Sequence, residues 1–252
     1  MDGMSLVFVG LAAVAAGAIN AIAGGGTLVS FPVMTAIGMP AVAANVTNTV
    51  ALWPGMVGGI YSQRRDLAGQ SRRLWLTVPV AAVGGMAGGI LLIRTGESTF
   101  RTIVPWLILL ATGLLALQDR LRRWLLQHPQ HRHQPETRAA LGVAVGAAAV
   151  YGGYFGAGLG VILLGVLGLV LDDSLTRLNA LKQTIALSAN FAAAVYFLTT
   201  GEVVWAAVVV MAVGALIGGS LGGRLAGRIA PATLRAIVIT VGLIVAIVYL
   251  VR

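Results

Sequence analysis

Residues 17–32 read GAINAIAGGGTLVSFP, and this stretch decides how the chain can fold. An apolar run that begins near residue 4 ends at residue 23, directly before three successive glycines, Gly24 to Gly26. The apolar run behind the glycines, 28–38, is too short to cross a bilayer, because a spanning helix needs about 20 residues. A short apolar helix behind a glycine break is typical of a helical hairpin or a discontinuous helix. At membrane depth, the exposed backbone of such a break is tolerated only where protein or a wet cavity covers it.

The composition places the chain in lipid. Of its 252 residues, 58% are hydrophobic and 10% are charged, whereas a soluble domain carries about 25% charged residues. Such a chain has more apolar surface than a globular core can bury. Apolar runs of roughly spanning length lie at 4–23, 40–62, 75–93, 102–118, 139–157, 177–198, 203–223 and 232–251. We therefore predict an all-α polytopic membrane protein.

The glycine break recurs in the second half of the chain, where GAGLG at 156–160 leads into a second short apolar run, 160–171. An offset of 134 positions places 24–26 on 158–160 and 45–48 on 179–182, and an offset of 130 places Gly84 and Gly88 on Gly214 and Gly218. The small-xxx-small spacing of these last glycines predicts close helix packing. We predict two repeats, each with a Gly-broken helical hairpin plus three spanning helices. The predicted parts are an N-terminal transmembrane repeat at 1–118, a basic cytoplasmic linker at 119–137 and a C-terminal transmembrane repeat at 138–252.

The arginines indicate how the repeats are oriented. If each short run returns the chain to the side from which its hairpin entered, the two halves are inverted. One side then receives the arginines of 64–73, 120–138, 177 and 224–235, and the other receives only Arg94, Arg101 and Arg252. Four simple crossings in each half would separate the arginines much less. Because basic loops stay in the cytoplasm, we predict a multi-pass protein of the cell inner membrane with a cytoplasmic linker and both termini on the other side.

Several classes of function are disfavoured by the residues that the spans lack. The chain has no cysteine, and its acidic residues fall in or beside loops. Thiolate chemistry is therefore excluded, and a cation substrate is disfavoured because cation transporters usually need a buried carboxylate. The loop histidines at 128, 131 and 133 do not predict a metal site, and the net charge of +9 does not predict nucleic-acid binding, since no aromatic and basic platform accompanies it. We predict no catalytic residue and no cofactor.

Polar residues inside the spans mark a candidate anion site. Backbone N–H groups at the starts of the two short helices, with the positive ends of the helix dipoles, favour an anion. Lys182 is the only lysine of the chain and would supply charge. The predicted substrate-binding residues are Asn20, Gly25, Gly26, Thr27, Asn45, Thr47, Asn48, Gly158, Gly160, Asn179, Lys182, Gln183 and Asn190. Two other readings stay open: Lys182 snorkels to the surface while the asparagines link helices, and the glycines serve packing alone.

At these same residues the sequence resembles the TauE/SafE family of membrane permeases. The resemblance lies in 17–32, 38–40 and 45–48, and again in 156–160, 179–182 and 218–222. It implies a secondary transporter, generally an exporter, of sulfite, sulfoacetate or another small organosulfur anion. Family members often carry a basic residue directly after the Thr-Asn pair, where this chain has Thr49, so Lys182 is left as the sole central cation. A membrane assembly factor and an intramembrane enzyme remain alternatives, and homo-oligomerisation and coupling to a proton or another ion stay open.

Overall fold

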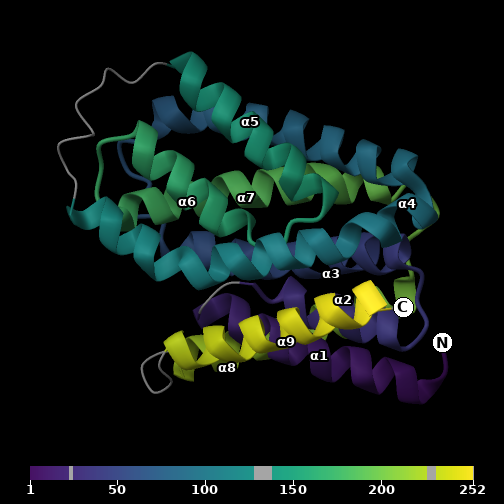
Figure 1. Cartoon of the computed structure of the whole chain (residues 1–252). Helices are drawn as coiled ribbons and strands as arrows, with labels where there is room; N and C mark the ends of the chain where they lie inside the picture. The colour runs from purple at the N-terminus through teal and green to yellow at the C-terminus, as the bar shows by residue number, and fades with distance from the viewer. Residues whose placement is uncertain (23–24, 128–137, 226–230, 252) are drawn as a thin grey trace.

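The computed structural model describes residues 1–22, 25–127, 138–225 and 231–251. Within these residues the secondary structure consists of helices joined by turns and loops, with no strand (Figure 1). The helices are α1 (Gly3–Ile22), α2 (Thr27–Ala36), α3 (Ala41–Ser62), α4 (Ser71–Gln127), α5 (Arg138–Tyr154), α6 (Leu159–Val170), α7 (Leu175–Phe197), α8 (Trp205–Leu225) and α9 (Pro231–Val251). By length and apolar composition, α1, α4, α8 and α9 are each able to cross a membrane. The prediction of an all-α polytopic membrane protein is confirmed. The predicted histidine loop lies outside the described residues.

Helix α4 contains two of the predicted spans. Its 57 residues are divided at Gly96, whose φ of 74° is a left-handed conformation that glycine adopts without strain. Glu97 follows this kink, and its carboxylate accepts hydrogen bonds from the N–H groups of Ala41 and Val42 at 2.6 and 2.8 Å. The kink is thereby tied to the start of α3. Beyond the second span α4 continues to Gln127, so the first part of the predicted linker, 119–127, is helical.

The two short helices lie against the helices that precede them, α2 against α1 and α6 against α5. An ion pair of 2.6 Å between Arg73 and Asp173 joins the start of α4 to the loop between α6 and α7. These two corners therefore share one end of the molecule, and both chain termini lie at the opposite end (Figure 1). The arrangement agrees with hairpins that return the chain to its side of entry. The inverted relation of the halves stays a prediction.

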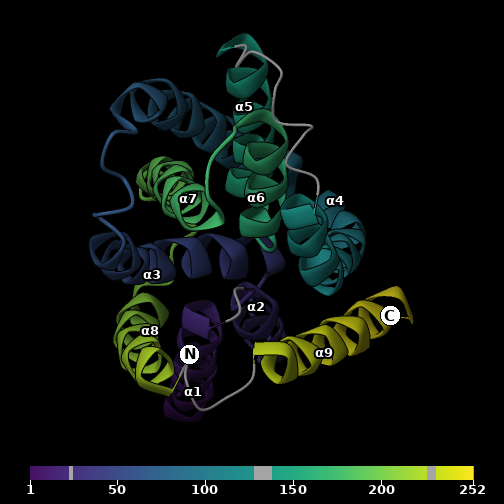
Figure 2. The same ribbon diagram turned by 90° about the vertical axis from the view of Figure 1, so that its left-hand side faces the viewer.

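The two halves of the chain interlock. Helix α1 of the first half packs along α8 of the second, and α5 of the second half packs along α4 of the first, with α3 between the two groups (Figure 2). Glycines make both contacts close. A methyl group built on Gly88 would lie 2.1 Å from the carbonyl oxygen of Val150, and one on Gly218 would lie 1.9 Å from that of Val14. The predicted close packing at these glycines is confirmed.

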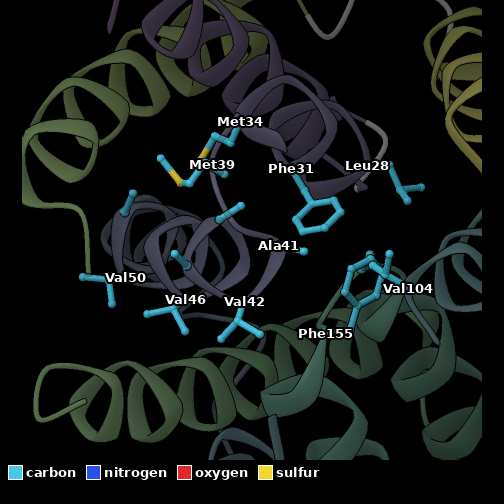
Figure 3. Packing of buried hydrophobic residues seen from close by; sticks show 14 of the residues in the cluster. Leu28, Phe31, Met34, Met39, Ala41, Val42, Val46, Val50, Val104 and Phe155 are labelled. Atoms are coloured by element: carbon cyan, nitrogen blue, oxygen red, sulfur yellow. The ribbon is translucent and has the colours of Figure 1, made fainter. Parts of the chain in front are cut away.

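One of the two buried apolar clusters of the described residues contains the buried apolar side chains of α2 (Figure 3). Leu28, Phe31 and Met34 on α2 are buried and belong to one cluster with Val42 and Val46 of α3. The same cluster holds Val104 of α4 and Phe155, which follows α5. Phe31 meets the ring of Phe155 edge to face, with 5.6 Å between centroids, a geometry that adds to the burial energy. This core fixes the short helix of the first half against the glycine break of the second.

Candidate functional site

Both glycine breaks contact the same stretch of α4. A methyl group on Gly25 would lie 3.2 Å from the side chain of Leu115, and one on Gly158 would lie 3.3 Å from the Cα of Ala111. Ala111 and Leu115 are one helical turn apart, and they fall near the middle of the part of α4 that follows Gly96. The starts of the two short helices are thus brought together at mid-depth in the bundle.

In the first half, four side chains converge on the start of α2. The Asn20 side-chain oxygen accepts a hydrogen bond of 2.8 Å from the N–H of Gly26. The Asn48 amide donates to the hydroxyl of Thr27 at 3.3 Å, and the Ser30 hydroxyl donates to the Asn48 oxygen at 2.5 Å. The predicted residues thus form two contacts at the start of α2, one between Asn20 and Gly26 and one between Asn48 and Thr27. Because Thr27 is the first residue of α2, its own amide has no carbonyl one turn back inside the helix.

In the second half, Lys182 takes the corresponding place beside the start of α6. Its ammonium nitrogen lies 3.8 Å from the position that a Cβ of Gly160 would occupy. Lys182 is half-buried and forms no hydrogen bond or ion pair with any other described residue. Asn190 on the same helix reaches the break as well, since its side-chain oxygen lies 3.7 Å from the Cβ position of Gly156. Two positive features, an ammonium group and a helix N-terminus, are adjacent here.

The other predicted residues bind different partners. Asn45 donates from its amide to the carbonyl of Tyr154 at 2.9 Å, and its own side-chain oxygen is buried and accepts no hydrogen bond from any described residue. Thr47 accepts from the N–H of Val204 at 3.1 Å, and Asn179 donates to Gln63 at 2.8 Å. All three link the two halves of the chain, which is the helix-linking role that the sequence left open. Gln183 is half-buried next to Lys182 on α7.

Sequence reasoning missed two residues that shape the breaks. Ser30 is fully buried one turn into α2, and Tyr151 donates from its hydroxyl to the carbonyl of Ala157 at 2.5 Å. The signal for Ser30 was its spacing, four positions after Gly26 in a mostly apolar helix. The signal for Tyr151 was its place five positions before Gly156. Both were visible, but neither residue type by itself distinguishes a site from packing.

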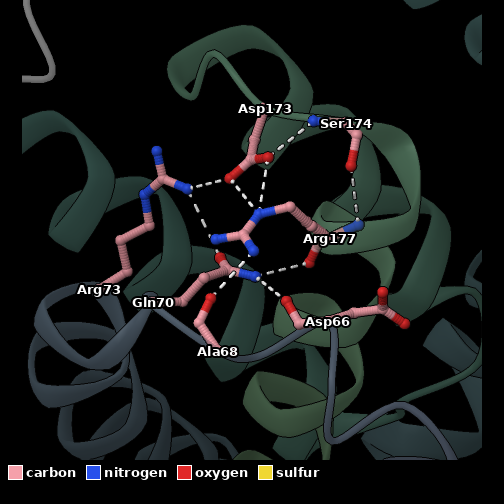
Figure 4. Close-up of polar contacts among 7 residues, drawn as sticks. All are labelled: Asp66, Ala68, Gln70, Arg73, Asp173, Ser174 and Arg177. Carbon is pink, nitrogen blue, oxygen red and sulfur yellow. Dashed lines mark hydrogen bonds and ion pairs between the residues drawn. The ribbon is translucent and has the colours of Figure 1, made fainter.

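A polar cluster joins the segment before α4 to the loop between α6 and α7, at the end of the molecule opposite to the chain termini (Figure 4). Asp173 accepts from Arg73 at 2.6 Å and pairs with Arg177 at 2.9 Å. Arg177 also donates to the carbonyl of Ala68 at 2.9 Å, and Gln70 donates to the carbonyl of Arg177 at 3.1 Å. Partial burial alone would raise the pKa of Asp173, but hydrogen bonds from Arg177 and Arg73 outweigh it and hold the pKa below its usual value. The cluster binds the loop before α7 to the first half.

The residues described by the structure contain no group of three or more histidine and acidic side chains placed to hold a metal ion. The arrangement of the site instead offers hydrogen-bond donors and one ammonium group, and a small anion fits this donor set.

Comparison with known proteins shows which family and which relatives this chain is similar to. A family model described as "Sulfite exporter TauE/SafE" matches residues 9–249. The "Probable membrane transporter protein YfcA" of Escherichia coli K12 is 28% identical over 203 residues, which are 80% of this chain and 73% of that protein. A "Probable membrane transporter protein" of Haemophilus influenzae is 28% identical over 201 residues, 79% of this chain and 76% of its own. No solved structure matches the chain.

Proposed function

The chain belongs to the sulfite exporter TauE/SafE family, and we propose that it is a secondary transporter that exports a small organosulfur anion such as sulfite or sulfoacetate. Its helices and its relatives' names make it a multi-pass membrane transporter. The proposal adds the substrate, the direction of transport and the site. It also places the protein in the inner membrane with its basic end in the cytoplasm.

The observation that carries the proposal is the position of Lys182, which lies beside the start of α6 and pairs with no other residue that the structure describes. A charge held away from bulk water is costly unless it is paired. Here the positive end of the α6 dipole adds to the charge of the ammonium group instead of compensating it. An anion bound between the ammonium group and the start of α6 would be attracted by both positive features and would compensate them. A cation would be repelled by both. The absence of a described acidic partner therefore favours an anionic ligand.

The first half supplies the opposite wall of the proposed site. The start of α2, with Thr27 and Asn48, offers neutral donors, and both breaks abut Ala111 and Leu115 on α4. An anion held at this junction would contact both repeats. In transporters of this kind, a rocking or gating movement of one helix bundle against another around a fixed midplane site exposes the site to each side in turn.

The repeats 1–118 and 138–252 and their inverted relation belong to this proposal, and matched contacts support the duplication. Gly84 approaches Gly146 of α5 as Gly214 approaches Gly10 of α1, and Gly88 approaches Val150 as Gly218 approaches Val14. The partners on α5 and α1 are separated by the same offset in both cases. Two halves that pack reciprocally in one register are expected from a duplicated unit.

The test is flux of sulfite and of sulfoacetate in proteoliposomes. We would compare the wild type with Lys182→Met, Asn48→Ala and the control Arg72→Gln, which removes an exposed charge from the basic end. Saturable flux that is lost in Lys182→Met, weakened in Asn48→Ala and kept in Arg72→Gln is expected. Absence of flux of either anion with folded wild-type protein would overturn the substrate assignment. Unchanged flux in Lys182→Met would overturn the site and favour a role for the lysine in helix packing.

A further inference from the structure

An amide side chain is ambiguous toward ions, because its oxygen accepts hydrogen bonds and its nitrogen donates them. Asn48 is 2% exposed and has one side-chain atom on Ser30 and the other on Thr27. If the amide nitrogen of Asn48 faces the start of α2, this wall of the site attracts an anion. If the amide oxygen faces it, the wall attracts a cation.

The two distances settle the orientation. The contact with the Ser30 hydroxyl is 2.5 Å, which suits O–H···O and is too short for N–H···O, and the contact with Thr27 is 3.3 Å. The amide oxygen therefore points to Ser30 and the NH₂ group points to Thr27. Ser30 also lies 3.3 Å from the carbonyl of Gly26, but the shorter contact takes its proton. The Thr27 oxygen accepts from Asn48, which leaves the Thr27 O–H free to donate.

We propose that Ser30 is a positioning residue that makes Asn48 a pure hydrogen-bond donor toward a bound oxyanion. The proposal rests on the anion site described above. Ser30 holds the only acceptor of the amide, so the hydrogen bonds run from Ser30 through Asn48 to Thr27 and end in donors at the N-terminus of α2. Hydrogen bonds in such a chain polarise one another. Without Ser30, the Asn48 oxygen would be a buried acceptor with no partner, and it would be free to turn toward the ligand.

The residues at the equivalent positions of the second half support this interpretation. The offset of 134 positions places Asn48 on Lys182 and Ser30 on Leu164. Asn48 contacts the start of α2, and Lys182 lies beside the start of α6. A lysine ammonium has donors and no acceptor, so it needs no neighbour to fix its polarity. The apolar Leu164 is accordingly sufficient where the first half has a serine.

The experiment is a double-mutant cycle with sulfite flux in proteoliposomes as the readout. Ser30→Ala and Ser30→Cys, which is close in size and a weaker donor, are made in the wild type and in Asn48→Ala. The control is Thr77→Val, which removes a buried hydroxyl that donates to the carbonyl of Arg73. Ser30→Ala should raise KM about three- to tenfold, the range expected for one neutral hydrogen bond, with the maximal rate within about twofold. The KM of Ser30→Cys should lie between those of the wild type and Ser30→Ala. Thr77→Val should leave KM unchanged.

The decisive result is the effect of Ser30→Ala on KM in the Asn48→Ala background. Once Asn48 is alanine, Ser30→Ala should have no further effect on KM, because the group that it positions is gone. An equal effect in both backgrounds, or an unchanged KM in the wild-type background, would overturn the role of Ser30 while leaving the transporter and its site in place. Absence of any sulfite or sulfoacetate flux in the wild type would instead overturn the proposed function, and the role of Ser30 with it.

Discussion

Replacing Gly218 with alanine tests the close contact between α1 and α8, and its neighbour Gly219 provides a matched control. A methyl group on Gly218 would lie 1.9 Å from the carbonyl oxygen of Val14 and 2.8 Å from its Cα. A methyl group on Gly219, one position along the same helix, meets no atom of the described residues closer than 4.0 Å. The two variants have the same composition and differ only in the face of α8 that carries the added carbon.

The size of the effect follows from this geometry. Backbone atoms cannot rotate away as a side-chain end can, so α1 and α8 must separate until the contact exceeds 3.0 Å, a displacement of roughly 1 Å. Overpacking of this kind costs about 1–3 kcal/mol, and a backbone clash places it at the upper end. The better helix propensity of alanine offsets about 1 kcal/mol. A net loss of about 2 kcal/mol corresponds to a fall in Tm of about 4–8 °C for a chain of this size.

Thermal unfolding of the purified protein in detergent, followed by gel filtration of the remaining folded fraction, measures this difference. Gly218→Ala should unfold at the lower temperature, whereas Gly219→Ala should equal or slightly exceed the wild type because only the propensity term acts. Equal Tm values for the two variants would refute the reasoning, since they would mean that the carbonyl of Val14 is not where the packing of α1 on α8 places it.

Two further predictions concern the opposite ends of the molecule. Glu97→Ala removes both hydrogen bonds to the start of α3 and should destabilise the protein by about 1–2 kcal/mol, whereas Glu97→Gln, which keeps an acceptor, should lose less; unchanged Tm in Glu97→Ala would contradict the cap. Asp173 has a pKa lowered below 3.8 by Arg177 and Arg73 despite partial burial, so its contribution to stability is present above the unfolded pKa and is lost as pH falls through the folded pKa. The wild type should therefore lose more stability than Asp173→Asn between about pH 5 and 2, and parallel pH curves for the two would argue against the ion pairs.

The helices were predictable because lipid makes the apolar pattern strict. The runs 4–23 and 232–251 differ from α1 and α9 by no more than one residue at either end. The sequence did not predict that α4 would continue through Gln127, because its last turns are polar and look like a linker. It also did not predict that α1 would lie on α8, since glycine spacing indicates a close contact without naming the partner helix.

The candidate site was predictable where a residue type has few uses. A lone lysine inside an apolar run has few roles, and Lys182 does lie beside a glycine break. Asparagine has many roles, and the sequence could not separate Asn48, which faces the start of α2, from Asn179, which bonds to Gln63. The partner of Asn179 is 116 positions away along the chain, so only the fold determines which role each amide has. Serine in a helix usually bonds to the carbonyl one turn back, which hides a residue such as Ser30.

The glycine contacts also constrain how the site can open. Methyl groups on Gly88 and Gly218 would overlap backbone atoms of α5 and α1, so in both pairs the helix backbones already touch. A movement that separated residues 1–118 as one body from residues 138–252 as another would break both of these contacts at once. These contacts are kept only if α1 moves together with α8 and α4 moves together with α5. Each of these pairs contains one helix from the first half of the chain and one from the second. If the proposed site opens by a rigid-body movement, the rigid bodies therefore differ from the predicted repeats, and the opening takes place between the pairs, around α3 and the short helices.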